Sequence, residues 1–248
     1  MDVRSGDSEL LDRQRGPGLA SAVTMPSMLE RLHAAGLRRV HGFAEAAVSL
    51  ASGRDGTTGK PELAELTIAS RNSRAGVHFV STPWAVLNWV HALLLADAEG
   101  ESWTFVDLGA GKGRAVLSAA TKPYARVIGV EFAAELAAVA RANVAAAGLD
   151  AQRIAIVEGD AAIFAFPREP LAVFLFNPFG PPVIDEVAAR LATHRRTCGQ
   201  PVRVAYVNPV HAASFSAAAG FRPRPLPSRA AALFAIASPY RLSMFDAT

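Results

Sequence analysis

The chain has 248 residues, 51% of them hydrophobic, which suits one α/β domain of ordinary size with an extension. Its 25 Lys and Arg exceed its 22 Asp and Glu by a net charge of only +3, and no basic stripe argues for nucleic acid. A single cysteine, Cys198, excludes an internal disulfide framework, and no Cys/His cluster has metal-ligand spacing. No apolar run reaches the ~18 residues of a membrane span. We therefore expect a cytoplasmic protein without a metal or a membrane partner.

The N-terminal third of the chain is predicted to lie outside the main domain. Residues 1–24 are polar and contain Gly and Pro, which is typical of a disordered tail. Residues 25–76 are predicted to form a helical extension or lid, because apolar residues recur at helical spacing over 27–50, with an interruption near Gly36. These helices are expected to cap the substrate side or to mediate homodimerisation.

The main domain is predicted to span residues 77–248 and to open with a helix over 83–95. Ser81 or Thr82 is the predicted N-cap and Pro83 the first helical position. The helical spacing of its apolar residues predicts which of them enter the core, namely Trp84, Leu87, Val90 and Leu94.

From Trp103 onward, strand and helix patterns alternate to the end of the chain. Strands are predicted at 103–107, 126–131, 153–158, 171–177, 202–208, 220–224 and 232–238, with helices at 113–121, 133–147, 161–165, 182–196 and 210–218. The last two strands have no helix between them and are interpreted as an antiparallel hairpin. The pattern predicts a doubly wound, mostly parallel seven-stranded α/β sheet that closes with this C-terminal hairpin.

The first of these strands leads into a glycine-rich turn. Asp107 ends the apolar run, and Gly109, Gly111 and Gly113 follow at every second position, before helix-forming sequence begins. A strand, a glycine turn and a helix together allow a backbone to approach a nucleotide-like ligand closely. A dinucleotide fingerprint would place its third glycine at Arg114, so the register disfavours NAD(P).

This spacing resembles the first motif of the class I S-adenosylmethionine (SAM) dependent methyltransferases, [D/E]-x-G-x-G-x-G. The resemblance implies SAM as the cofactor, held by Asp107, Gly109, Ala110, Gly111 and Gly113. It also implies that further SAM contacts follow at the ends of the next strands, where an open parallel sheet binds its ligand.

Two acids follow the second and third predicted strands. Glu131 can accept hydrogen bonds from two ribose hydroxyls, and Phe132 can lie against the adenine. In the resembled family an acid at the position of Asp160 takes the adenine amino group, and the next backbone N–H, that of Ala161, meets a ring nitrogen. Each acid could instead cap a helix, and Phe132 could be a core aromatic.

The fourth predicted strand ends in Asn177-Pro178-Phe179, the predicted catalytic segment, and Asn177 is also expected to contact SAM. Amino- and amide-directed methyltransferases carry [D/N]-P-P-[Y/F/W] here, and the Asn accepts hydrogen bonds from the nitrogen to be methylated. Non-SET histone lysine methyltransferases also place an Asn- and Phe-containing segment at this position. Phe179 and Gly180 depart from the first pattern, so adenine specificity does not follow, and a plain Asn-Pro turn is the alternative.

Other polar residues receive weaker predictions. Thr82, in the segment before the first strand, is a second-rank SAM contact, and Lys112 or Arg114 could add charge for the carboxylate of SAM. Tyr206 lies inside the fifth strand and is predicted to be a core residue.

The sequence therefore predicts a SAM-dependent methyltransferase that acts on an unidentified acceptor, with nitrogen of a protein lysine or a small-molecule amine favoured. Protein and small-molecule acceptors are favoured over nucleic acid, because the net charge is weak. The alternatives are a small-molecule O- or C-methyltransferase and a non-catalytic SAM-binding regulatory protein. A NAD(P)-dependent oxidoreductase is the most disfavoured.

Overall fold

A computed structural model describes residues 28–29, 31–37, 39–40, 82–98, 102–150, 152–218 and 220–247. The predicted tail at 1–24, Ser81 and most of the predicted extension at 25–76 lie outside these residues. Among the described residues, no helix has both the length and the apolar character needed to cross a membrane.

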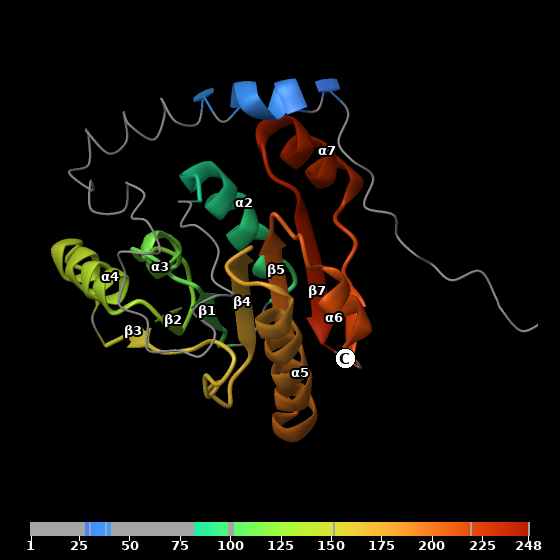
Figure 1. The fold of residues 1–248 in the computed structure, drawn as a ribbon. Helices are drawn as coiled ribbons and strands as arrows, with labels where there is room; N and C mark the ends of the chain where they lie inside the picture. The colour runs from blue at the N-terminus through green and yellow to red at the C-terminus, as the bar shows by residue number, and fades with distance from the viewer. Residues whose placement is uncertain are drawn as a thin grey trace, which may run out of the picture.

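The described residues build a seven-stranded sheet (Figure 1). Its strands in chain order are β1 (Thr104–Leu108), β2 (Arg126–Glu131), β3 (Ile154–Glu158), β4 (Leu171–Phe176), β5 (Val202–Val207), β6 (Phe221–Pro223) and β7 (Leu242–Ala247). Their order in space is β3-β2-β1-β4-β5-β7-β6. The first five strands are parallel, and β7 runs antiparallel to both of its neighbours. The predicted doubly wound sheet with antiparallel C-terminal strands is confirmed.

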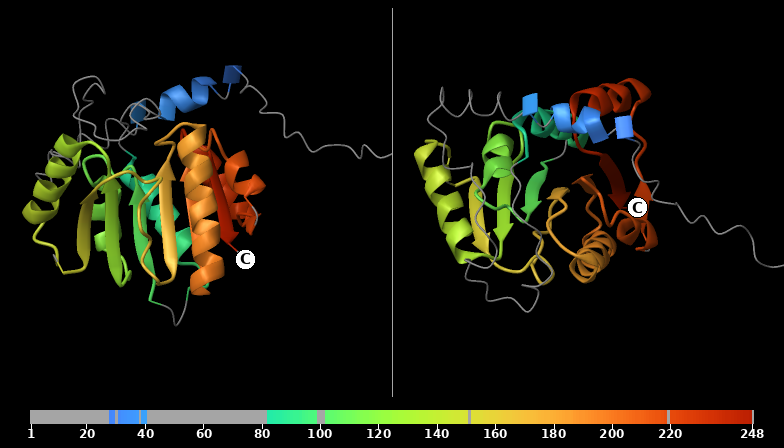
Figure 2. Two further views of the ribbon diagram at one scale, coloured as in Figure 1. Left: turned by 60° about the horizontal axis from the view of Figure 1, so that its bottom comes forward. Right: turned by 45° about the horizontal axis from the view of Figure 1, so that its top comes forward.

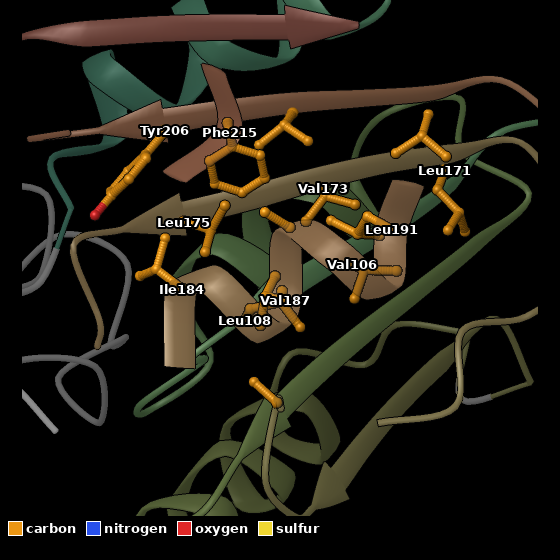
Figure 3. Packing of buried hydrophobic residues seen from close by; sticks show 14 of the residues in the cluster. Val106, Leu108, Leu171, Val173, Leu175, Ile184, Val187, Leu191, Tyr206 and Phe215 are labelled. Carbon is orange, nitrogen blue, oxygen red and sulfur yellow. The ribbon is translucent and has the colours of Figure 1, made fainter. Parts of the chain in front are cut away.

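Helices cover both faces of the sheet (Figure 2). They are α2 (Trp84–Leu94), α3 (Arg114–Ala120), α4 (Ala134–Ala146), α5 (Pro181–Cys198), α6 (Ala213–Ala217) and α7 (Ser228–Ala237). Alternate residues of each strand point to opposite faces of the sheet, so each strand contributes side chains to two hydrophobic cores, one on each face. On one face, residues of α5 and α6 pack on the sheet, among them Ile184, Val187, Leu191 and Phe215 (Figure 3). On the other, α2 and α3 contribute Leu87, Val90, Leu94, Val116 and Leu117.

The predicted strand at 232–238 is wrong, because these residues belong to α7 and the following Ser238. Its alanine-rich apolar run favours a helix, and periodicity alone cannot separate a short apolar strand from a buried helix. The true last strand, β7, begins at Leu242 and pairs with both β5 and β6. The C-terminal strands are therefore antiparallel, as predicted, but a helix joins β6 to β7.

Three smaller predictions also differ from the structure. Residues 161–163 form turns, so no helix covers the predicted range 161–165. Residues 31–37 remain helical through Gly36, where an interruption was predicted. Pro83 is the N-cap of α2, and no side chain caps that helix, so Thr82 does not play the predicted capping role.

Part of the predicted N-terminal extension lies beside α7. Nε2 of His33 is 3.2 Å from the carbonyl oxygen of Ile236, which places the helical residues 31–37 next to that helix (Figure 1).

Candidate active site

The sheet reverses its strand order between β1 and β4, and the glycine turn lies at the carboxyl end of β1. In open parallel sheets ligands bind at this type of switch point. Gly109, Gly111 and Gly113 have φ angles of 85°, 53° and 83°, in the left-handed region that favours glycine. Gly113 is also the residue before α3. The alternating glycines therefore shape the turn that carries the chain from β1 into α3.

The first and third glycines are also needed for close packing. A Cβ at Gly109 would come within 2.5 Å of Cβ of Pro178, and one at Gly113 within 3.1 Å of Cβ of Ala140 on α4. The turn after β4 thus lies directly against the turn after β1. The predicted cofactor-binding and catalytic segments are neighbours in space.

Glu131, the last residue of β2, points toward the glycine turn. Its Oε2 accepts a hydrogen bond of 2.7 Å from the N–H of Gly111, and its Oε1 accepts one of 2.9 Å from the N–H of Ala133. The side chain is buried, and burial raises the pKa of its carboxyl group. Each carboxylate oxygen keeps a second lone pair for a ligand. The predicted ribose contact stays a prediction, and Glu131 also binds the backbone just before α4.

Asp107 is buried in β1, immediately before the turn. Burial, and next the negative charge of Glu131, raise the pKa of Asp107 to about 8. At neutral pH its carboxyl group is therefore mostly protonated in the free protein, which limits repulsion between the two acids.

A small pocket opens beyond Glu131. It is lined by residues from the ends of β2 and β3 and from the segment after β4, namely Val130, Phe132, Gly159, Asp160, Ala161, Phe179 and Val183. Apolar walls with one carboxylate are suited to a flat heteroaromatic ring that carries an amino group. Oδ1 of Asp160 accepts a hydrogen bond of 2.8 Å from the N–H of Ala162, which orients this carboxylate within its turn.

The structure thus brings the predicted adenine-side residues Phe132, Asp160 and Ala161 together. Phe179, predicted to contact the methyl acceptor, is buried at 6% exposure and lines the same pocket. Its position favours contact with the base of the cofactor. Its predicted contact with the acceptor stays untested.

Asn177 follows β4 and adopts the left-handed conformation, with φ of 41°. Its side-chain Oδ1 accepts a hydrogen bond of 3.1 Å from the hydroxyl of Tyr206. Tyr206 is fully buried, as predicted for a core residue, but its hydroxyl also reaches the predicted catalytic segment. Tyr206 is the second-last residue of β5, which pairs with β4. This position near the end of a neighbouring strand was the only sequence feature that pointed to a contact with the segment after β4.

Arg114 has a role that sequence reasoning missed. It is buried, its guanidinium lies 5.6 Å from the ring centre of Trp84, and its Nη1 is 3.4 Å from the carbonyl oxygen of Thr82. Arg114 therefore ties the segment before α2 to the start of α3. Thr82 is itself buried, and its predicted contact with the cofactor stays a prediction.

The methyltransferase domain family model matches residues 105–199, from β1 through α5. This stretch is a SAM-dependent methyltransferase domain. It holds the glycine turn, Glu131, Asp160 and Asn177, and the predicted resemblance to class I methyltransferases is confirmed. SAM is the cofactor that this family implies.

Several solved structures have a similar fold. An RNA methyltransferase from Salinibacter ruber in complex with S-adenosyl-L-homocysteine is 23% identical, over 68% of this chain and 93% of its own, with a TM-score of 0.44. A TehB-like SAM-dependent methyltransferase from Corynebacterium glutamicum is 12% identical, over 64% and 88%, with a TM-score of 0.44. The mitomycin 7-O-methyltransferase MmcR is 17% identical, over 66% and 54%, with a TM-score of 0.46. The names of the first and third proteins point to different methyl acceptors, RNA and mitomycin. No curated protein matches the sequence.

Proposed function

We propose that this methyltransferase transfers the methyl group of SAM to a nitrogen atom, in a protein lysine or a small-molecule amine. The observation that carries this proposal is the contact between Gly109 and Pro178, which joins the two halves of the site. Because Pro178 lies against the glycine turn, we expect the polar groups of Asn177 to lie next to the proposed cofactor site.

The residues at the strand ends fit SAM. The Gly109–Gly113 turn packs against Pro178 with no room for a Cβ at Gly109, and Glu131 accepts a hydrogen bond from the N–H of Gly111 in this turn. The pocket beside Phe132, Asp160 and Phe179 provides apolar walls and one carboxylate for the base. SAM, when bound, supplies a sulfonium methyl group whose leaving group needs no further activation. The protein therefore mainly has to hold and orient the nucleophile.

Asn177 supplies groups that suit an N–H nucleophile. Its backbone carbonyl and its side-chain Oδ1 are hydrogen-bond acceptors, and Oδ1 keeps one lone pair after accepting the bond from Tyr206. Acceptors of this type orient an amine by its hydrogens and leave the nitrogen lone pair directed at the methyl group. A lysine amine has an ordinary pKa of about 10.4, so it must first release a proton to water. The neutral amine then attacks the methyl group without further activation.

The proposal is tested by transfer of labelled methyl groups from SAM to poly-L-lysine and spermidine, with catechol as an oxygen acceptor. We expect label in an amine that is stable to alkali and is recovered as methyllysine after acid hydrolysis of poly-L-lysine, or as N-methylspermidine. Asn177→Ala should lower this transfer strongly and leave the binding of S-adenosyl-L-homocysteine (SAH) unchanged. Asn208→Ala is the matched control, since Asn208 also has a positive φ, 50°, and precedes a proline at the end of a neighbouring strand.

The same assay separates the alternatives. Label in catechol alone would support an O-methyltransferase, and tight SAH binding without transfer to lysate fractions would support a regulatory SAM-binding protein. Equal transfer by Asn177→Ala and the wild type would contradict the assigned role of Asn177.

A further inference from the structure

We propose that Tyr206 is a positioning residue for methyl transfer, whose hydroxyl fixes the side-chain amide of Asn177 in the orientation that meets the acceptor. This inference rests on the proposed function, because it concerns the residue that is expected to orient the nucleophile. Tyr206 is separate from the cofactor pocket described above, and it acts through Asn177.

The ring of Tyr206 is held rigidly by the core. Tyr206 is fully buried on β5, pairs in register with Leu175 of β4, and meets the ring of Phe215 edge to face at 6.1 Å. Figure 3 shows the ring beside Leu175, with its hydroxyl oxygen directed toward the arrowhead end of β4. Asn177 follows that end by one residue. The sheet and α6 therefore fix where the hydroxyl stands, and the 3.1 Å bond transmits this position to Asn177.

The identity of the two atoms also fixes the direction of this bond. Oδ1 of Asn177 is an amide oxygen and only accepts hydrogen bonds, so the Tyr206 hydroxyl is the donor. Burial raises the pKa of Tyr206 to about 12, and the hydroxyl therefore keeps its proton at neutral pH. Tyr206 is thus a donor to Asn177 and is not suited to act as a general base.

A donor of this kind distinguishes between the two ends of an amide. Rotating the Asn177 amide by 180° exchanges Oδ1 and Nδ2 at little steric cost. Nδ2 can donate to the hydroxyl oxygen but cannot accept the hydroxyl proton, and leaving this buried donor without its acceptor is costly. The bond therefore holds Oδ1 toward β5 and fixes both the second lone pair of Oδ1 and the Nδ2 hydrogens in space. Without it, the half-buried Asn177 would sample both orientations.

The variant that removes only the hydroxyl is Tyr206→Phe, and the chain offers a matched control in Tyr124→Phe. Tyr124 is equally buried, at 2% exposure, and its hydroxyl forms a 3.1 Å hydrogen bond with Nδ1 of His91 on α2. Both changes remove one buried hydroxyl bond and keep the ring. A general loss of stability should therefore affect the two variants alike.

The first readout is the Nδ2 signal of Asn177 in ¹⁵N-labelled free protein, identified by its absence in Asn177→Asp. We expect Tyr206→Phe to shift this signal and to bring its relaxation toward that of a mobile side-chain amide, and Tyr124→Phe to leave it in place. An unchanged Asn177 signal in Tyr206→Phe would overturn the inference. This readout needs neither cofactor nor acceptor.

The second readout is single-turnover methyl transfer from labelled SAM to poly-L-lysine. We expect Tyr206→Phe to lower the rate about tenfold, as for one lost hydrogen bond, with SAH affinity and the pH profile below pH 10 unchanged. In an Asn177→Ala background the same change should have no further effect, because the two residues act as one unit. An equal loss in that background would overturn the inference. Absence of transfer by the wild type would count against the amine acceptor alone, and the amide signal would still decide the role of Tyr206.

Discussion

The carboxylate of Glu131 accepts a hydrogen bond of 2.7 Å from the backbone N–H of Gly111, so the end of β2 is joined to the turn after β1. This contact places a buried acid against the glycine turn. It also makes Glu131 part of the frame of the site, because the same carboxylate holds the N–H of Ala133.

Glu131→Ala should weaken SAH binding by about 1–3 kcal/mol, because a buried hydrogen-bonding group is lost and two backbone N–H groups lose their partner. Isothermal titration calorimetry measures this affinity. Glu158→Ala is the control: Glu158 pairs with Glu131 in register, but it is exposed and forms an ion pair with Arg141 at 3.5 Å. Equal affinities of the Glu131 variant and the wild type would show that Glu131 only supports the turn.

Asp160→Ala should weaken SAH binding by about 1–3 kcal/mol if its carboxylate meets the base. Part of any loss could come from its own turn, and Asp150→Ala controls for this. Oδ1 of Asp150 makes the equivalent bond, 2.9 Å to the N–H of Gln152, at the surface. A loss of affinity in both variants, or in neither, would contradict a contact between Asp160 and the cofactor.

Gly109→Ala should abolish SAH binding and methyl transfer, because the new Cβ would force Pro178 and the glycine turn apart. Gly148→Ala is the matched control: Gly148 also has a positive φ, of 61°, but a Cβ there meets nothing within 4 Å. Both variants should lose about 1–2 kcal/mol of stability from the left-handed backbone. Thermal unfolding and calorimetry separate the two effects, and retained SAH binding in Gly109→Ala would show that the close contact is dispensable.

The raised pKa of Asp107 predicts a pH-dependent stability. The ordinary pKa of 3.8 applies to the unfolded chain and a pKa of about 8 to the folded one, so the folded state binds more protons between these values. Stability from this group is therefore fully present below about pH 4 and is lost as the pH rises to 8. Asp107→Asn should flatten the fall of the melting temperature between pH 5 and 8. Parallel curves for the variant and the wild type would contradict a buried, protonated Asp107.

Much of the fold could be predicted, because parallel strands buried on both faces leave continuous apolar runs such as the one in β4. The C-terminal part was harder. The run at 232–238 is as apolar as a strand, whereas the true strand β7 is mixed in character and is defined by its pairing with β5 and β6. Pairing between distant segments leaves little local signal.

The candidate site shows the same difference between features that are local in the sequence and contacts between distant segments. The glycine turn and the acids at the strand ends were visible in the sequence, because each follows directly on a predicted strand. The contacts between segments were not. Neither the packing of Pro178 on Gly109 nor the bond from Tyr206 to Asn177 follows from spacing along the chain, since both depend on how adjacent strands align. Arg114 was predicted to add charge for the carboxylate of SAM or to be solvated, and its packing against Trp84 likewise could not be inferred from the sequence.

A crystal structure of the protein with SAH tests the central claim most directly, namely that the strand ends form one cofactor site next to Asn177. We predict ribose hydroxyls on Glu131, the base beside Asp160 between Phe132 and Phe179, and the sulfur facing the turn of Asn177 and Pro178. SAH bound elsewhere, or bound here with its sulfur directed away from Asn177, would contradict the account.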